Sequence, residues 1–140
     1  MFEQIVRNQG NKFYRVKDGA IADAQEELGI VLPKELTEFY TEVGYGFLYS
    51  KEDNFNRIMD PQSVCDFRLR AGQFAGYSEL DIYDSYERNR VIFFEICEGN
   101  YLSIGFAKSN QGKVFYGKKK IANSLKDFLI QYQQDEHYFE

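Results

Sequence analysis

The chain of 140 residues is 44% hydrophobic and 17% aromatic, and it carries a formal net charge of −5. A chain of this length and composition can bury a core without disulfides or metal ions, which excludes disordered, collagen-like and low-complexity classes. The negative charge argues against direct nucleic-acid binding, and no apolar run approaches the length of a membrane span. We expect one soluble domain over residues 1–140.

The first third of the chain predicts two helices. Residues 1–17 form a polar, mildly basic N-terminal segment. Apolar residues then recur at helical spacing over 20–28, and Gly29 is typical of a helix end. A second helix is expected over 34–43, where apolar residues recur at i, i+3, i+4 and i+7. Gly44-Tyr45-Gly46 follows and is interpreted as helix termination rather than a phosphate-binding loop.

The middle of the chain is mixed. Short strands are expected at 47–50 and 55–59. Asp60-Pro61 favours the start of a third helix, because proline fits the first helical turn without losing a hydrogen bond. The stretch 72–89 fits neither a helix nor a strand pattern and is left open between helix and loop.

The last third predicts strands and a closing helix. The run 91–97 is apolar on both faces except for one glutamate, which is typical of a central strand. Strands at 101–106 and 113–116 follow. The final helix, 125–133, leaves 133–140 as an acidic tail that we expect to be frayed. This order predicts an α+β domain with helices packed around one mostly antiparallel, meandering sheet.

The apolar positions of these elements predict the core. It should include Leu28, Leu36, Phe39, Ile92, Phe94, Leu102, Ile104, Phe128 and Leu129.

Catalytic chemistry has little support in the sequence. The one histidine, His137, lies near the chain end. Cys65 and Cys97 have apolar neighbours that favour neutral thiols, and neither has a second ligand at metal-binding spacing. Asp81 and Asp84 could act as a hydrolytic pair, but nothing distinguishes them from surface acids. We expect no enzymatic activity, no cofactor and no metal; without a signal peptide, the cytoplasm is the expected location.

Four motifs between Asp18 and Tyr132 share their order and spacing with a known superfamily. They are Ile21 to Gly46 (with Leu28-Gly29, Leu32-Pro33 and Phe39-Tyr40), Gly99-Asn100-Tyr101-Leu102, Gly112–Tyr116 and Ile121–Leu129. Together they resemble the SUKH superfamily, which includes bacterial immunity proteins and related fungal cell-wall regulators. One departure is Gly44-Tyr45-Gly46, where the family often has Asn-Gly-Gly.

The resemblance implies an intracellular immunity protein (antitoxin) that binds and neutralises a polymorphic, contact-delivered or secreted toxin domain, with a nuclease as one candidate. The implied partner is the cognate toxin, with no nucleic acid or membrane, and the protein would be a monomer or weak dimer. Two alternatives stay open: a non-catalytic regulatory or scaffold domain, and a small-molecule enzyme on an α+β fold.

The segment Tyr77–Glu87 is the main candidate for partner contact. It interleaves three tyrosines with four acids and contains no base. Tyrosine is enriched at interfaces, and acids suit the basic cleft that a nuclease needs. The predicted partner-binding residues are Tyr45, Tyr77, Glu79, Asp81, Tyr83, Asp84, Tyr86 and Glu87. The competing interpretation is a solvated segment whose tyrosines face inward, and the alternative surface carries Lys113 and Lys118–Lys120.

Overall fold

The computed structural model describes all 140 residues. Its helices are α1 (Glu3–Arg7), α2 (Ala20–Leu28), α3 (Lys34–Glu42), α4 (Pro61–Leu69), the 3₁₀ helices η1 (Gly72–Phe74) and η2 (Ser78–Tyr86), and α5 (Leu125–Gln134). Its strands are β1 (Lys12–Tyr14), β2 (Tyr45–Phe47), β3 (Arg57–Ile58), β4 (Arg90–Ile96), β5 (Asn100–Gly105), β6 (Val114–Tyr116) and β7 (Lys119–Ala122).

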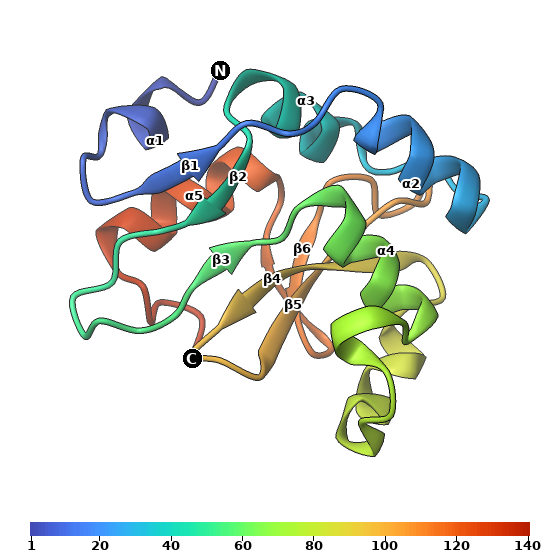
Figure 1. Cartoon of the computed structure of the whole chain (residues 1–140). Helices are drawn as coiled ribbons and strands as arrows, with labels where there is room; N and C mark the ends of the chain where they lie inside the picture. Colours follow the sequence, from blue (N-terminus) through green and yellow to red (C-terminus); the bar gives the residue numbers. More distant parts are fainter.

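The seven strands form one sheet in the order β1-β2-β3-β4-β5-β6-β7, and every neighbouring pair is antiparallel. The sheet is therefore a continuous meander, and the predicted α+β class is confirmed. The β4–β5 hairpin is its longest pairing and lies at its centre (Figure 1). The strand predicted from apolar residues on both faces is β4, which is covered on both sides.

Cross-strand partners share a face of a sheet, so the register assigns each side chain to one of two faces. One row of cross-strand partners runs from Phe13 through Gly46, Ile58 and Phe94 to Leu102. Ile104 lies two residues after Leu102, on the same face, and pairs with Val114. These residues form the inner face. It packs on α5 and α3.

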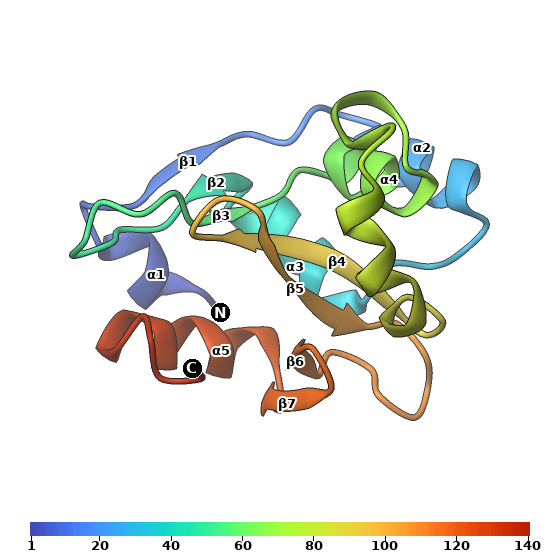
Figure 2. The same ribbon diagram turned by 90° about the horizontal axis from the view of Figure 1, so that it is seen from below.

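Aromatic contacts show which helices cover the inner face. The Phe94 ring lies 5.2 Å from that of Phe128 on α5, and the Phe13 ring lies 5.7 Å from that of Phe39 on α3. Helix α5 lies beneath the sheet in Figure 2, with α1 beside it. The helices thus close the inner face along its whole length.

The outer face is covered only in part. Helix α4 lies over the β4–β5 half, where the ring of Phe67 is 4.8 Å from that of Tyr101. Figures 1 and 2 show α4 on the opposite side of the sheet from α5, and no helix over β1, β2 and β3 on that side. The outer face of these three strands is therefore open.

The predicted core is confirmed at every position except Leu28. The other eight are buried, whereas Leu28 is half-buried. The reason is that α2 lies at the edge of the fold and packs mainly on α4, so only Ala24 of α2 is fully buried.

The N-terminal segment is more than a polar extension. Phe2 and Ile5 are buried, and Phe2 packs edge-on against Phe39 with ring centroids 5.0 Å apart. Residues 12–14 add strand β1 to the sheet. Lys119 and Lys120, for which the sequence predicted no strand, lie in strand β7.

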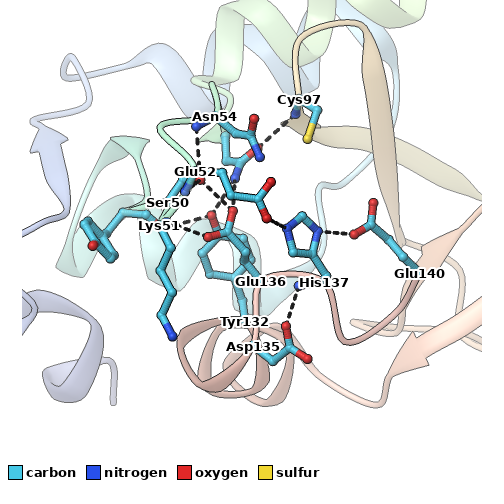
Figure 3. Close-up of polar contacts among 12 residues, drawn as sticks. Ser50, Lys51, Glu52, Asn54, Cys97, Tyr132, Asp135, Glu136, His137 and Glu140 are labelled. Carbon is cyan, nitrogen blue, oxygen red and sulfur yellow. Dashed lines mark hydrogen bonds and ion pairs between the residues drawn. The ribbon is translucent and has the colours of Figure 1, made fainter.

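The expectation of a frayed C-terminal tail is wrong. Phe139 is buried beside Phe128, and Glu136 is 8% exposed. The Glu136 carboxylate accepts hydrogen bonds from the Ser50 hydroxyl (2.6 Å) and the Lys51 backbone N–H (2.7 Å) in the β2–β3 connection (Figure 3). A buried carboxylate with several donors is a stable anchor, so residues 135–140 are docked.

Candidate functional site

Segment η2 arranges its side chains by the 3₁₀ period of three residues. Leu80, Tyr83 and Tyr86 therefore lie on one side and face the fold; Leu80 and Tyr83 are buried and Tyr86 is half-buried. Glu79 and Asp81 lie on the other sides and are exposed. The sequence left this stretch open, because a 3₁₀ helix follows neither the α nor the β period.

Tyr83 belongs to the core and does not offer a surface for contact, which corrects its assignment as a binding residue. Its ring lies 5.7 Å from Phe67 and 5.5 Å from Tyr101, and its hydroxyl accepts a hydrogen bond from the Tyr101 N–H at 3.2 Å. Burial raises the pKa of Tyr83. The inward-facing interpretation holds for this tyrosine.

Glu87 is also buried, and it stabilises the fold through an ion pair instead of offering a surface to a partner. The Arg70 guanidinium nitrogen Nη2 lies 2.6 Å from Glu87 Oε1 and 2.7 Å from Asp84 Oδ1. Burial raises the pKa of Glu87, while the bond to Arg70 opposes that shift. The same guanidinium lies over the Phe67 ring. Arg70 therefore ties the end of η2 to α4.

The acidic character of the segment is concentrated at its start. Asp84 is exposed but ion-paired, and with Glu87 it lines a shallow hollow that also contains Arg68, Arg70 and Arg88. These arginines offset the charge of that end. Glu79 and Asp81 are exposed, and neither carboxylate forms a salt bridge, since no cationic nitrogen lies within 4.0 Å of it.

Tyr77 and Glu79 line a hollow of about 380 Å³ on the outer face of the sheet. Its floor includes Tyr101, Glu95 and Arg57, with Glu98 at the β4–β5 turn. Glu95 is nearly buried, and its Oε1 lies 2.8 Å from Arg57 Nε. Because Arg57 is committed to this pair, Glu79 and Glu98 give the hollow an excess of negative charge.

Sequence reasoning missed Arg57, Glu95 and Glu98 as members of this hollow. Glu95 was visible as the one charged residue in an apolar strand. Its partner could not be identified without the register Arg57↔Glu95, which places the two side chains opposite each other on paired strands.

Tyr45 lies apart from the η2 residues. It is half-buried in β2, where its ring is 5.8 Å from that of Tyr14. It lines a different hollow, of about 490 Å³, together with Asp18, Asp23 and Asp60 as well as Arg15 and Lys17. The structure therefore does not bring Tyr45 into contact with Tyr77 or Glu79.

The cysteines and the histidine considered for catalysis are not arranged for it. Burial, with Glu27 nearby, raises the pKa of the Cys65 thiol to about 11, and burial also raises that of Cys97, so both thiols are protonated at neutral pH. His137 Nε2 lies 2.5 Å from Glu52 Oε1, and Nδ1 bonds to Glu140, so neither ring nitrogen faces a nucleophile (Figure 3).

No group of three or more His, Cys, Asp or Glu side chains is placed to hold a metal ion. None of the helices has the length and apolar character needed to cross a bilayer.

Comparison with known proteins gives two matches. The model of the SMI1 / KNR4 family (SUKH-1) matches residues 15–131. A protein of Bacillus subtilis (strain 168) named "Immunity protein YxxD" is 42% identical over 135 residues, which cover 96% of this chain and 92% of that protein. No solved structure matches significantly.

Proposed function

The chain belongs to the SMI1 / KNR4 (SUKH-1) family, and from this premise we propose that it is an immunity protein that binds and neutralises a toxin domain. The observation that carries the proposal is the 42% identity to a protein named as an immunity protein, over nearly the full length of both chains. Identity of this extent means that the two chains share one fold.

The proposed mode of action is stoichiometric binding rather than catalysis. Both thiols have raised pKa values, and the ring nitrogens of His137 are engaged by Glu52 and Glu140. Neither thiol is therefore activated, and His137 is not free to act as a base beside one. The protein would act as a monomer or weak dimer in the cytoplasm, and it would block the toxin by covering its active cleft.

A toxin with a basic cleft fits the acidic side of the molecule best. Glu79 and Asp81 are exposed on η2, and Glu98 lines the same hollow as Glu79. Carboxylates at this surface would pair with lysine or arginine side chains that otherwise hold a polyanionic substrate. We therefore propose a nuclease as the toxin class, with Tyr77, Glu79 and Asp81 among the contact residues.

Co-expression tests the proposal directly. The probe is the C-terminal domain of a candidate toxin, sought as a large secreted protein encoded beside this gene and expressed in a host that it kills. Co-expression of this chain should restore growth, and the purified proteins should form a complex that light scattering measures as one-to-one. Unrelieved toxicity together with the absence of a complex would refute the proposal.

A further inference from the structure

The open half of the outer sheet face carries a cluster of aromatic side chains that lies apart from the proposed contact residues of η2. We define the aromatic face as Tyr14, Tyr45, Phe47 and Phe55. Tyr14 and Phe55 are 49% and 46% exposed, and the other two are half-buried. No helix covers the outer face of β1 and β2, which carry the first three rings, and Phe55 lies in the connection between β2 and β3 (Figure 1).

The strand register brings the rings together. Tyr14 pairs with Tyr45 across β1 and β2, and Phe47 lies two residues along on the same face. Ring centroids are 5.8 Å apart for Tyr14–Tyr45, 6.5 Å for Tyr14–Phe47 and 5.0 Å for Phe47–Phe55. Contiguous exposed aromatic surface of this kind marks an interaction site, whereas isolated exposed apolar residues do not.

The aromatic face connects the two hollows that flank it. Tyr45 lines the hollow that contains Asp18, Asp23 and Asp60. At the other end, Phe47 is the cross-strand neighbour of Arg57, which lines the hollow of Tyr77 and Glu79. The two predicted contact regions thus lie at opposite ends of one surface.

Around the aromatic face, carboxylates outnumber the basic side chains that are not already in an ion pair. Of the bases in the two hollows, Arg15 is paired with Asp18 at 2.6 Å and Arg57 with Glu95 at 2.8 Å, which leaves Lys17. Lys12 also lies on this face, opposite Phe47. Against these two lysines stand the carboxylates of Asp23, Asp60, Glu79 and Glu98.

We propose that the aromatic face is the centre of the toxin interface, and that it takes a protein surface presenting arginine or lysine side chains. Cations stack favourably on the faces of tyrosine and phenylalanine rings, and the carboxylates at both ends would pair with neighbouring cations of the same partner. A central aromatic patch with a polar rim is the arrangement in which a few residues dominate affinity. This inference rests on the proposed function.

The test measures the binding kinetics of the neighbouring toxin domain, in an inactive form, with single variants of this chain. Tyr14→Ala and Phe55→Ala should each weaken binding by on the order of tenfold, mainly through faster dissociation, with unchanged melting temperature. Tyr116→Ala is the matched control, because Tyr116 is an exposed aromatic at the other end of the sheet. It should bind as the wild type does.

A conservative variant tests the chemistry of the partner. Phe55→Leu keeps apolar area but removes the ring face, so it should lose most of the affinity that Phe55→Ala loses. If Phe55→Leu binds as the wild type does while Phe55→Ala does not, the rings supply apolar area only and the cationic partner is wrong.

Failure of the inference is distinguishable from failure of the proposed function. Tight binding by the wild type with unchanged affinity in all aromatic-face variants would overturn the inference alone. A wild type that does not bind would overturn both. In a third outcome the wild type is a dimer, and Phe55→Ala converts it to monomers without changing its affinity for the toxin. This result would show that the aromatic face binds a second copy of this chain, and it would overturn the inference.

Discussion

Glu136 holds the C-terminal segment in place by accepting hydrogen bonds from a loop that lies about 85 residues earlier in the sequence. It receives hydrogen bonds from Ser50 and from Lys51, and Asn56 Nδ2 lies 3.4 Å from Oε2. The sequence could not reveal this anchor, because an acidic residue in a polar tail looks the same whether solvated or bonded. The partners become visible only when the β2–β3 connection is placed beside the end of α5.

Replacing Glu136 should therefore destabilise the fold. Glu136→Ala leaves the Ser50 hydroxyl and the Lys51 N–H without their acceptor, which should cost about 1–3 kcal/mol in the free energy of unfolding. Urea denaturation measures the loss. Glu140→Ala is the control, because Glu140 is exposed, and it should cost well under half as much. Equal effects of the two variants would mean that the tail is not anchored by Glu136.

His137 gives the tail a pH dependence. Glu52 and then Glu140 raise the pKa of His137 above its ordinary value of 6.5. A group whose folded pKa is raised contributes stability that is fully present below the unfolded pKa and is lost as pH rises through the folded pKa. The tail should therefore be held more tightly at about pH 6 than at about pH 9.

The comparison with His137→Gln isolates this effect. The difference in urea midpoint between the wild type and His137→Gln should shrink as pH rises from about 6 to about 9. Glu52→Gln should reduce that pH dependence, since it removes the larger cause of the shift. A midpoint difference that stays constant with pH would contradict this role for His137.

Among the elements, helix α3 organises the N-terminal part of the fold. Its Phe39 is fully buried and contacts both Phe2, before α1, and Phe13, on β1. Phe39→Ala should therefore cost about 3–5 kcal/mol, as large aromatic deletions in cores do. Chemical denaturation measures this, and Phe55→Ala, at an exposed ring, should cost less than about 1 kcal/mol. A small effect at Phe39 would show that α1 and β1 are not docked through it.

The elements also show where sequence reasoning works. The bounds of α2, α3 and α5 were predicted within one residue, and the start of α4 was predicted at Pro61, because a glycine, proline or serine marks a boundary of each helix. Ser124 accepts the Asp127 N–H at 3.0 Å, as an N-cap does. The strands β1 and β7 were missed, since three or four residues are too few to show alternation against a polar background.

The candidate site was predictable only in part. The exposure of Tyr77, Glu79 and Asp81 agrees with their assignment to a surface, whereas Tyr83 and Glu87 are buried. The burial of Tyr83 follows the 3₁₀ period of η2, which was not recognised in the sequence, whereas Glu87 lies just after η2 and is paired with Arg70. The aromatic face was missed because it depends on register: Tyr14, Phe47 and Phe55 come from separate segments that only the sheet brings together.

For the whole molecule, charge should govern the rate of association. Glu79→Lys combined with Asp81→Lys should slow toxin binding by on the order of tenfold and weaken its dependence on salt, because rim charges act mainly on the on-rate. Stopped-flow or biosensor kinetics at two salt concentrations measure this. Thermal stability should stay unchanged, since both carboxylates are exposed.

The matched control reverses the same number of charges elsewhere. Asp127→Lys with Asp135→Lys changes helix α5 and its C-terminal end, on the opposite side of the sheet from the proposed interface, and gives the same net charge. It should alter the on-rate much less. If both double variants slow association equally, the effect comes from net charge and not from the η2 carboxylates.

Amide hydrogen exchange of this chain, free and in a one-to-one mixture with the inactive toxin domain, is the sharpest test of the proposed interface. Binding at the proposed surface should slow exchange in two regions, residues 77–82 of η2 and residues 45–57 around β2 and β3. Slowing at both would support one continuous interface that includes the aromatic face. Slowing confined to residues 113–122, which carry Lys113 and Lys118–Lys120, would contradict the proposed interface and place the toxin at the opposite end of the sheet.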